Sequence, residues 1–111
     1  MGKFIISKRI NDDYQFNLKA ANGQVILTSQ GYSSKSSCEK GIDSVRVHSK
    51  DRSKFEINTA KDGRFYFNLK AGNGQVIGTS QMYESENGLE NGIESVKTNA
   101  PIALVADESN H

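Results

Sequence analysis

The sequence predicts an α+β protein made of two copies of one unit, each a three-stranded antiparallel meander followed by an amphipathic helix. Three observations predict it: an internal repeat at a spacing of 51 residues, stretches in which apolar and polar residues alternate, and later stretches in which apolar residues recur every three to four positions. The alternating stretches precede the helical ones in both copies, so the strands come first in each unit.

The repeat covers most of the chain. Residues 4–49 align with residues 55–100 without a gap, and 22 of these 46 pairs are identical. A unit of under about fifty residues is usually too small to bury its own apolar face. We therefore expect one domain over residues 1–111 with a shared core. Its expected parts are repeat one at 1–50, repeat two at 51–106 and a frayed tail at 107–111.

Each copy carries the signals of a meander. Its second strand alternates aromatic and leucine side chains with polar ones, the period of a strand with one buried face. Asn22-Gly23 and Asn73-Gly74 follow, and such pairs predict a hairpin with a type I′ turn, in which both central residues take positive φ. The expected strands are 4–8, 14–19 and about 24–30 in the first copy, and 55–59, 65–70 and about 75–81 in the second.

An amphipathic helix follows each meander. Cys38, Ile42 and Val45 are spaced i, i+4, i+7, and the second copy repeats this stripe. The helices start either at Ser34 and Ser85 or at the capping boxes Ser36–Glu39 and Asn87–Glu90. Gly41 and Gly92 lie inside the helices, which predicts a close approach of the backbone to the sheet. Pro101 ends the second helical region, and residues 102–106 read as a last strand.

Composition bounds the class of protein. Hydrophobic residues make up 35% and charged residues 24% of 111 residues, and the net charge is +1. This predicts a globular domain without the strong positive field typical of nucleic-acid binders. No apolar run is long enough to span a membrane, and the start resembles no signal peptide. Cys38 is the single cysteine, which excludes an internal disulfide and favours the reducing cytoplasm.

The tandem blocks FNLKAxNGQVI-TSQ-Y, each followed by a helix with Gly-Ile-x-Ser-Val, resemble the YegP-like family, a bacterial domain of unknown function. The resemblance covers nearly the whole chain. It implies a single antiparallel sheet formed by two β-β-β-α-β repeats, with helices on one face, pseudo-two-fold symmetry and terminal strands exchanged between the halves. It implies no activity and carries over no catalytic or binding residue. This sequence departs little from the pattern, with Cys38 in the first helix where the second has Leu89.

The sequence contains no recognisable catalytic constellation, and we expect neither enzymatic activity nor a cofactor. Cys38 and His48 are ten residues apart, too far to meet on one short helix, and Cys38 lies on the apolar stripe, so a packed thiol is expected. One cysteine and two histidines give no metal-ligand spacing. The carboxylates of the second helix region are those of a solvated face.

Two groups of residues are candidates for binding. The side chains that alternate with the core point to the open face of the sheet and form a polar surface. They are Gln15, Asn17, Lys19, Tyr66, Asn68 and Lys70. The asparagine and the lysine are identical in both copies, which fits a two-fold recognition patch, or simply a duplication that has not diverged. The second group lies where the third strand turns into the helix, and either caps that corner or contacts a ligand. It comprises Gln30, Tyr32, Gln81 and Tyr83.

Charge differs between the copies. Residues 1–50 hold 8 basic and 4 acidic residues, and residues 51–111 hold 6 and 9, giving +4 and −3. The charges either promote weak head-to-tail association or merely solubilise the domain, so we expect a monomer or a weak homodimer.

The sequence therefore favours a small non-enzymatic interaction or accessory module that binds a protein or another macromolecule through its open sheet face or its helix pair. A nucleic-acid binder using Lys19, Lys70 and Tyr66 is the alternative, and a membrane partner is not expected.

The shared-core model makes the two copies interdependent. A polypeptide of residues 1–50 is expected to be largely unstructured or to self-associate, because its apolar face has no partner. Circular dichroism and sedimentation would check this, and a stable monomeric half would contradict the model.

Overall fold

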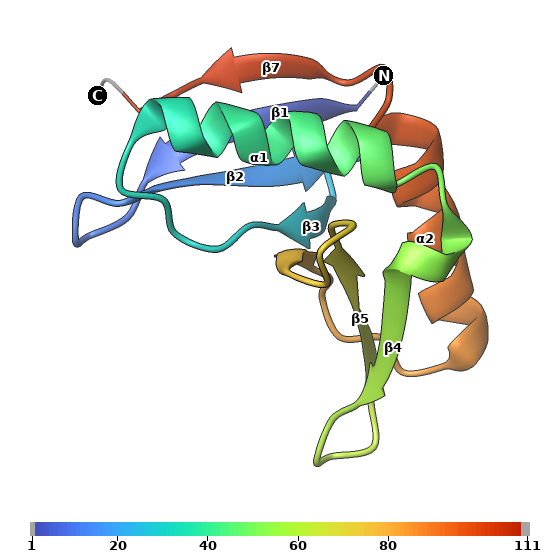
Figure 1. Ribbon diagram of the computed structural model, residues 1–111. Coiled ribbons are helices and arrows are strands. Elements are labelled where there is room, and N and C mark those ends of the chain that lie inside the picture. The colour runs from blue at the N-terminus through green and yellow to red at the C-terminus, as the bar shows by residue number, and fades with distance from the viewer. Residues whose placement is uncertain (1, 110–111) are drawn as a thin grey trace.

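A computed structural model describes residues 2–109, and Figure 1 shows its two similar halves. The elements follow the order β1 (Lys3–Lys8), β2 (Tyr14–Lys19), β3 (Val25–Thr28), α1 (Lys35–His48), a 3₁₀ turn (Arg52–Lys54), β4 (Phe55–Thr59), β5 (Phe65–Lys70), β6 (Val76–Thr79), α2 (Glu86–Asn99) and β7 (Leu104–Asp107). Two β-β-β-α units are therefore present, as the repeat predicts. The strand after α1 is β4, the first strand of the second unit, so β7 is an addition to the pattern.

The strands form one seven-stranded sheet in the order β4-β5-β6-β3-β2-β1-β7. Neighbouring strands are antiparallel except β1 and β7, which are parallel. The expectation of an all-antiparallel sheet is thus wrong at one pair. The sheet is mixed because α2 forms a crossover that lets β7 enter the edge in the direction of β1. The exchange of a terminal strand is confirmed, since β7 follows the second helix but lies against the first half.

The third strands are shorter than expected because side chains replace the ladder at both ends. The Asn22 side chain accepts a hydrogen bond from the Gln24 N–H at 3.0 Å, and the Ser29 hydroxyl accepts one from the Phe16 N–H at 2.9 Å. The same pattern recurs in the second copy. The hairpins also differ from a type I′ turn. Gly23 takes a φ of 84° but Asn22 does not take a positive φ, and the strands shift register beside the turn, as in a hairpin with a bulge.

The last strand begins later than expected, and it extends into the segment that was expected to fray. The N–H of Ile102 still bonds to the carbonyl of Asn99 at the end of α2, which delays β7 to Leu104–Asp107 rather than 102–106. Asp107, expected to fray, ends β7, and Ser109 is buried. Residues 110–111 of the expected tail lie outside the described part of the chain.

The helices begin at Ser34 and Ser85. The Ser34 hydroxyl accepts a hydrogen bond from the Ser37 N–H at 3.1 Å, and Ser85 caps the Gly88 N–H at 3.0 Å. These two caps, and not the capping boxes, satisfy the free donors of the first turn.

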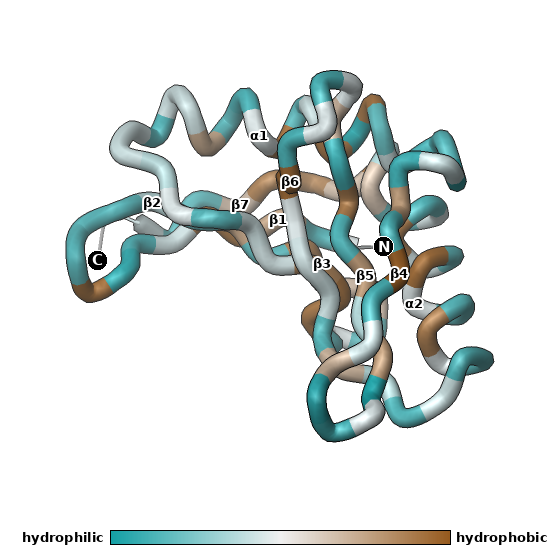
Figure 2. The backbone as a smooth tube through the Cα atoms, turned by 60° about the horizontal axis from the view of Figure 1, so that its bottom comes forward, coloured by the Kyte–Doolittle hydropathy of each residue, from teal (hydrophilic) through white to brown (hydrophobic). Residues whose placement is uncertain are grey.

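Both helices pack on one face of the sheet, with their apolar stripes inward. Figure 2 shows α1 over the half that contains β1, β2 and β7, and α2 beside β4 and β5. The expected stripes are buried, including Cys38, Ile42 and Val45. The close approach predicted by the helix glycines is real, but its partner is a tyrosine. A Cβ on Gly41 would collide with the ring and hydroxyl of Tyr32, and Gly92 meets Tyr83 in the same way.

The two halves meet at β3 and β6, where one bridge pairs Thr28 with Thr79. Beside this bridge, the side chain of Leu27 occupies the space over Gly78, where an added Cβ would lie 2.7 Å from it. Leu27 and Gly78 are equivalent positions of the two copies, so a large side chain in one copy is matched by the smallest in the other. The helices also cross the seam, since α1 contacts β6 and α2 contacts β3.

β7 is fixed to the first half by an ion pair. The Lys35 ammonium lies 2.7 Å from the Asp107 carboxylate, and the N–H and hydroxyl of Ser109 donate to the same carboxylate at 2.9 and 2.5 Å. The hydrogen bonds from Lys35, followed by those from Ser109, hold the pKa of Asp107 well below its usual range. The outer edge of β1 is thereby covered.

The seam makes a prediction about symmetry-related side chains. Gly78→Leu is expected to lower the free energy of unfolding by about 1–3 kcal/mol, because Leu27 already fills the space. The exchange Leu27→Gly with Gly78→Leu restores the total volume, and its cost is expected to be smaller than the sum of the two single changes.

Urea unfolding measures these effects. Gly72→Ala is the matched control, because its counterpart is Ala21 and the nearest atom to the new Cβ lies 3.7 Å away. If the cost of the double exchange equals the sum of the costs of the two single changes, Leu27 and Gly78 do not share one space.

Candidate functional site

The six residues expected on the open face lie on β2 and β5, on the side away from the helices. Their neighbours in each strand, such as Phe16 and Leu18, are fully buried, while the six are half-buried. The alternation of side chains along a strand accounts for this placement. The two halves of the face are not chemically alike, even though Asn17 and Lys19 repeat as Asn68 and Lys70.

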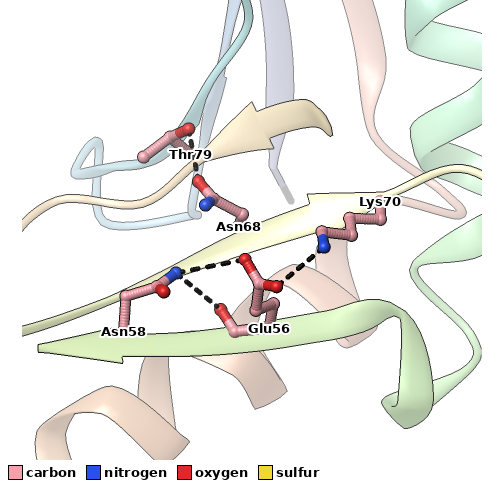
Figure 3. A network of polar contacts seen from close by, with 5 residues as sticks. All are labelled: Glu56, Asn58, Asn68, Lys70 and Thr79. Atoms are coloured by element: carbon pink, nitrogen blue, oxygen red, sulfur yellow. Dashed lines mark hydrogen bonds and ion pairs between the residues drawn. The ribbon is translucent and has the colours of Figure 1, made fainter. Parts of the chain in front are cut away.

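In the second half, the repeated polar residues bond to polar neighbours on β4 and β6 (Figure 3). The Lys70 ammonium lies 2.7 Å from the Glu56 carboxylate, and the Thr79 hydroxyl donates to the Asn68 side-chain oxygen at 2.8 Å. The Asn58 amide also donates to Glu56, at 3.4 Å. The Lys70 hydrogen bond is the largest cause of a lowered pKa at Glu56. Lys70 is thus neutralised by its neighbour.

In the first half, the corresponding lysine has no such partner among residues 2–109. The counterpart of Glu56 is Ile5, and Lys19 lies opposite Lys3 in the strand register. Lys3, Ile5 and Lys19 line a hollow of about 300 Å³ beside the β2–β3 turn, with Glu108 at its rim. The open face is therefore cationic at one end and charge-balanced at the other.

A larger polar hollow of about 510 Å³ lies at the seam between the halves. Thr28 and Thr79 contribute to it from the bridge that joins β3 to β6. The other lining residues come from the β1–β2 turn and from the segments after the third strands. They are Arg9, Asp13, Ser29, Gln30, Gly31 and Ser80. The hollow thus exposes hydroxyl, amide and charged groups of both copies in one place.

Two of the six candidates connect to this hollow through hydrogen bonds. Arg9 donates from Nε to the Gln15 side-chain oxygen at 2.7 Å, and Thr79 donates to Asn68. Lys19 and Lys70 do not line it. Sequence reasoning missed Arg9 and Asp13 because the repeat gives no signal for them: their counterparts are Ala60 and Arg64.

The corner residues divide into half-buried and exposed members. The rings of Tyr32 and Tyr83 stack on Phe16 and Phe67 at 6.3 Å, and burial raises the pKa of both tyrosines. Gln30 and Gln81 are exposed. The Ser29 hydroxyl, inside the same motif, accepts from the Phe16 N–H and donates to the Gln30 carbonyl at 2.8 Å. The corner is therefore built on Ser29 and Tyr32, and Gln30 faces the hollow.

Cys38 and His48 lie at different places on α1, and each has its own surroundings. Cys38 is fully buried, and desolvation raises its thiol pKa to about 11. The Gly72 N–H donates to His48 Nε2 at 3.1 Å, so Nδ1 carries the proton and donates to the Ser44 carbonyl at 2.8 Å. Within residues 2–109, no three His, Cys, Asp or Glu side chains gather as a metal site, and no helix has the length and apolarity to cross a bilayer.

The repeat, the mixed sheet and the seam define a tandem-repeat α+β protein. A family model described as a domain of unknown function (DUF1508) matches it twice, at residues 11–56 and 60–107. This chain is 50% identical to the UPF0339 protein YegP of Escherichia coli K12, over 97% of this chain and 98% of that one. The chain belongs to this family, the YegP-like UPF0339 proteins with two DUF1508 units. Other bacterial relatives include a Pseudomonas aeruginosa protein, 48% identical over 96% of this chain and 97% of that one.

Solved relatives share the fold. The solution structure of Escherichia coli yegP, described as a protein of unknown function, superposes with a TM-score of 0.94 at 49% identity, covering 99% of this chain and 95% of that one. A UPF0339 protein of Shewanella oneidensis gives 0.92 at 45% identity, covering 97% and 92%.

The buried thiol predicts low reactivity and a specific alkaline effect. At pH 8, native Cys38 is expected to react with a disulfide reagent at least ~100-fold more slowly than in urea, because a pKa raised from 9.0 to about 11 lowers the thiolate fraction and burial blocks access. The unfolded thiol ionises near pH 9, whereas the folded thiol keeps its proton until about pH 11. The free energy of unfolding therefore falls as pH rises from 9 towards 11.

Cys38→Val separates this effect from the tyrosines and lysines that titrate in the same range. The difference in unfolding free energy between the two proteins is expected to change above pH 9 and to stay constant below it. A constant difference throughout would contradict the raised pKa.

Proposed function

We propose that this protein is a non-enzymatic interaction module that binds a protein partner through the polar open face of its sheet. The observation that carries the proposal is the hollow at the seam, because it gathers exposed polar groups of both copies at the centre of an otherwise broad surface. Hydroxyls from Thr28 and Thr79 and the side chain of Gln30 offer donors and acceptors for a polar segment. The two tyrosines of the corner group would then position its two glutamines, Gln30 and Gln81, for contact.

One further point supports a protein partner. The half of the face around Lys70 is already charge-balanced by Glu56, which favours hydrogen-bonded recognition over capture by charge alone. The reducing compartment suggested by the single cysteine is the cytoplasm, where we place the module. No cofactor is part of the proposal, and the helix pair is the alternative contact surface for such a partner.

A second candidate function rests on the cationic half. Lys3 and Lys19 face each other across β1 and β2, and Tyr66 lies on the same face. Lysines and an aromatic ring on an open sheet are the elements of a weak single-stranded nucleic-acid surface.

The test of the module uses affinity capture with the immobilised full-length protein. Thr28→Arg is expected to abolish capture of the proteins that the unchanged protein retains, because a long cation fills the hollow. Ile102→Lys, at an exposed position between α2 and β7, is the matched control and is expected to keep them. Retention of the same proteins by Thr28→Arg, or capture of none by the unchanged protein, would refute binding at the hollow.

Fluorescence anisotropy with labelled single-stranded RNA and DNA decides between the two candidates. Nucleic-acid binding requires affinity at low salt that falls steeply as salt rises, and Lys19→Glu would weaken it. Absence of binding at low salt removes this candidate and leaves the protein-binding proposal intact.

A further inference from the structure

The outer strands of the two halves, β1 and β4, have different neighbours in the sheet. β1 and β4 are equivalent strands: Ile6 pairs with Phe16 on β2 as Ile57 pairs with Phe67 on β5. On its other side β1 pairs with β7, whereas β4 is the last strand of the sheet on its side within residues 2–109. One consequence is a large difference in burial, because Ile6 is 1% exposed and Ile57 is 44% exposed.

The uncovered edge borders a hollow of about 280 Å³ between β4 and the start of α2. Ile57, Phe65 and Leu89 give it an apolar floor, and Thr59, Glu86 and Glu90 complete its lining. The corresponding positions of the first half are Ile6, Tyr14, Cys38, Lys8, Lys35 and Glu39. There, the chain's own C-terminal segment is present, with Asp107 opposite Ile6 and paired with Lys35.

The first half therefore shows how this edge accepts an extended segment. β7 runs parallel to β1, and the N–H of Glu108 donates to the Ile6 carbonyl at 2.8 Å. Val105 and Asp107 lie two residues apart, so their side chains share the face that carries α1. Because Ile57 has the same register with β5 as Ile6 has with β2, its main-chain groups face outward in the same way and are open to an added strand.

The charge of the edge differs between the halves, and this selects the occupant. Lys35, the partner of Asp107, is replaced by Glu86 at the equivalent place on α2, and Glu90 lies on the next turn. Glu90 is paired with Arg52 at 2.8 Å, and Glu86 has no ion pair among the described residues. A second copy of β7 would bring Asp107 and Glu108 against these carboxylates, which is unfavourable.

We propose that the β4 edge and the start of α2 form a docking groove for an extended, basic segment of another protein. The segment adds to β4 as a parallel strand, as β7 adds to β1. Its apolar side chain covers Ile57 and Phe65, and a lysine or arginine two residues later pairs with Glu86, at the place where β7 carries Asp107. This groove is separate from the hollow on the open face and stands independently of that function.

Two peptides test the charge rule on the full-length protein. The first has the sequence of residues 101–109 with blocked ends, and the second carries Asp107→Lys in the same sequence. The Lys peptide is expected to shift the amide resonances of β4 and of the first turn of α2 in ¹⁵N spectra, with an affinity about tenfold or more above that of the Asp peptide.

Protein variants identify the groups involved. Glu86→Lys is expected to reverse the preference, so that the Asp peptide binds more tightly. Ile57→Lys is expected to remove binding of the Lys peptide; its side chain is exposed, so the fold is retained. Ile10→Lys, at a fully exposed isoleucine away from β4, is the matched control and leaves binding unchanged.

Three results would overturn the proposal. They are the absence of shifts at β4 with the Lys peptide at millimolar concentration, equal binding of the two peptides, and shifts confined to β1 and β7. Self-association of the protein through the β4 edge, seen by sedimentation and lost in Ile57→Lys, would identify a second copy as the occupant and would equally reject the basic segment.

Discussion

The close contact between Leu27 and Gly78 is the constraint on which the arrangement of the two halves depends. Among residues 2–109, one β-bridge, Thr28 to Thr79, is the whole strand pairing at the seam, so side-chain packing fixes how the halves meet. Equal side chains at these two positions would either collide or leave a cavity, and both outcomes destabilise a core. The repeated sequence therefore had to diverge at this point, while the residues on either side remained identical.

The same seam determines where chemistry is possible on the open face. Because the third strands are short and end at Thr28 and Thr79, the chain leaves the sheet early on both sides of the bridge and a polar hollow remains. The repeated asparagines and lysines of β2 and β5 lie on the same open face, but their surroundings differ. Glu56 neutralises Lys70, whereas Ile5 leaves Lys19 uncompensated, so the duplication provides similar residues with unlike properties.

Much of the fold follows from the sequence because it depends on local signals. The alternation around Phe16 and Phe67, the stripe through Ile42 and Ile93, and the serine caps each act within a few residues. The parallel pairing of β7 with β1 has no local signal, since it joins segments about a hundred residues apart. The hollow could not be predicted from the sequence either. Arg9 and Asp13 have no equivalent in the second copy, and the β1–β2 turn places them at the hollow.

The pairing of β1 with β7 also bears on how the molecule is synthesised. Lys3 and Ile6 are synthesised about a hundred residues before their partners Leu104 and Asp107. During translation the nascent first half therefore presents a bare strand with an apolar Ile6 beside it, a surface of the kind that chaperones recognise. The β1 edge can close only after β7 has been synthesised, and such long sequence separation between paired strands slows folding.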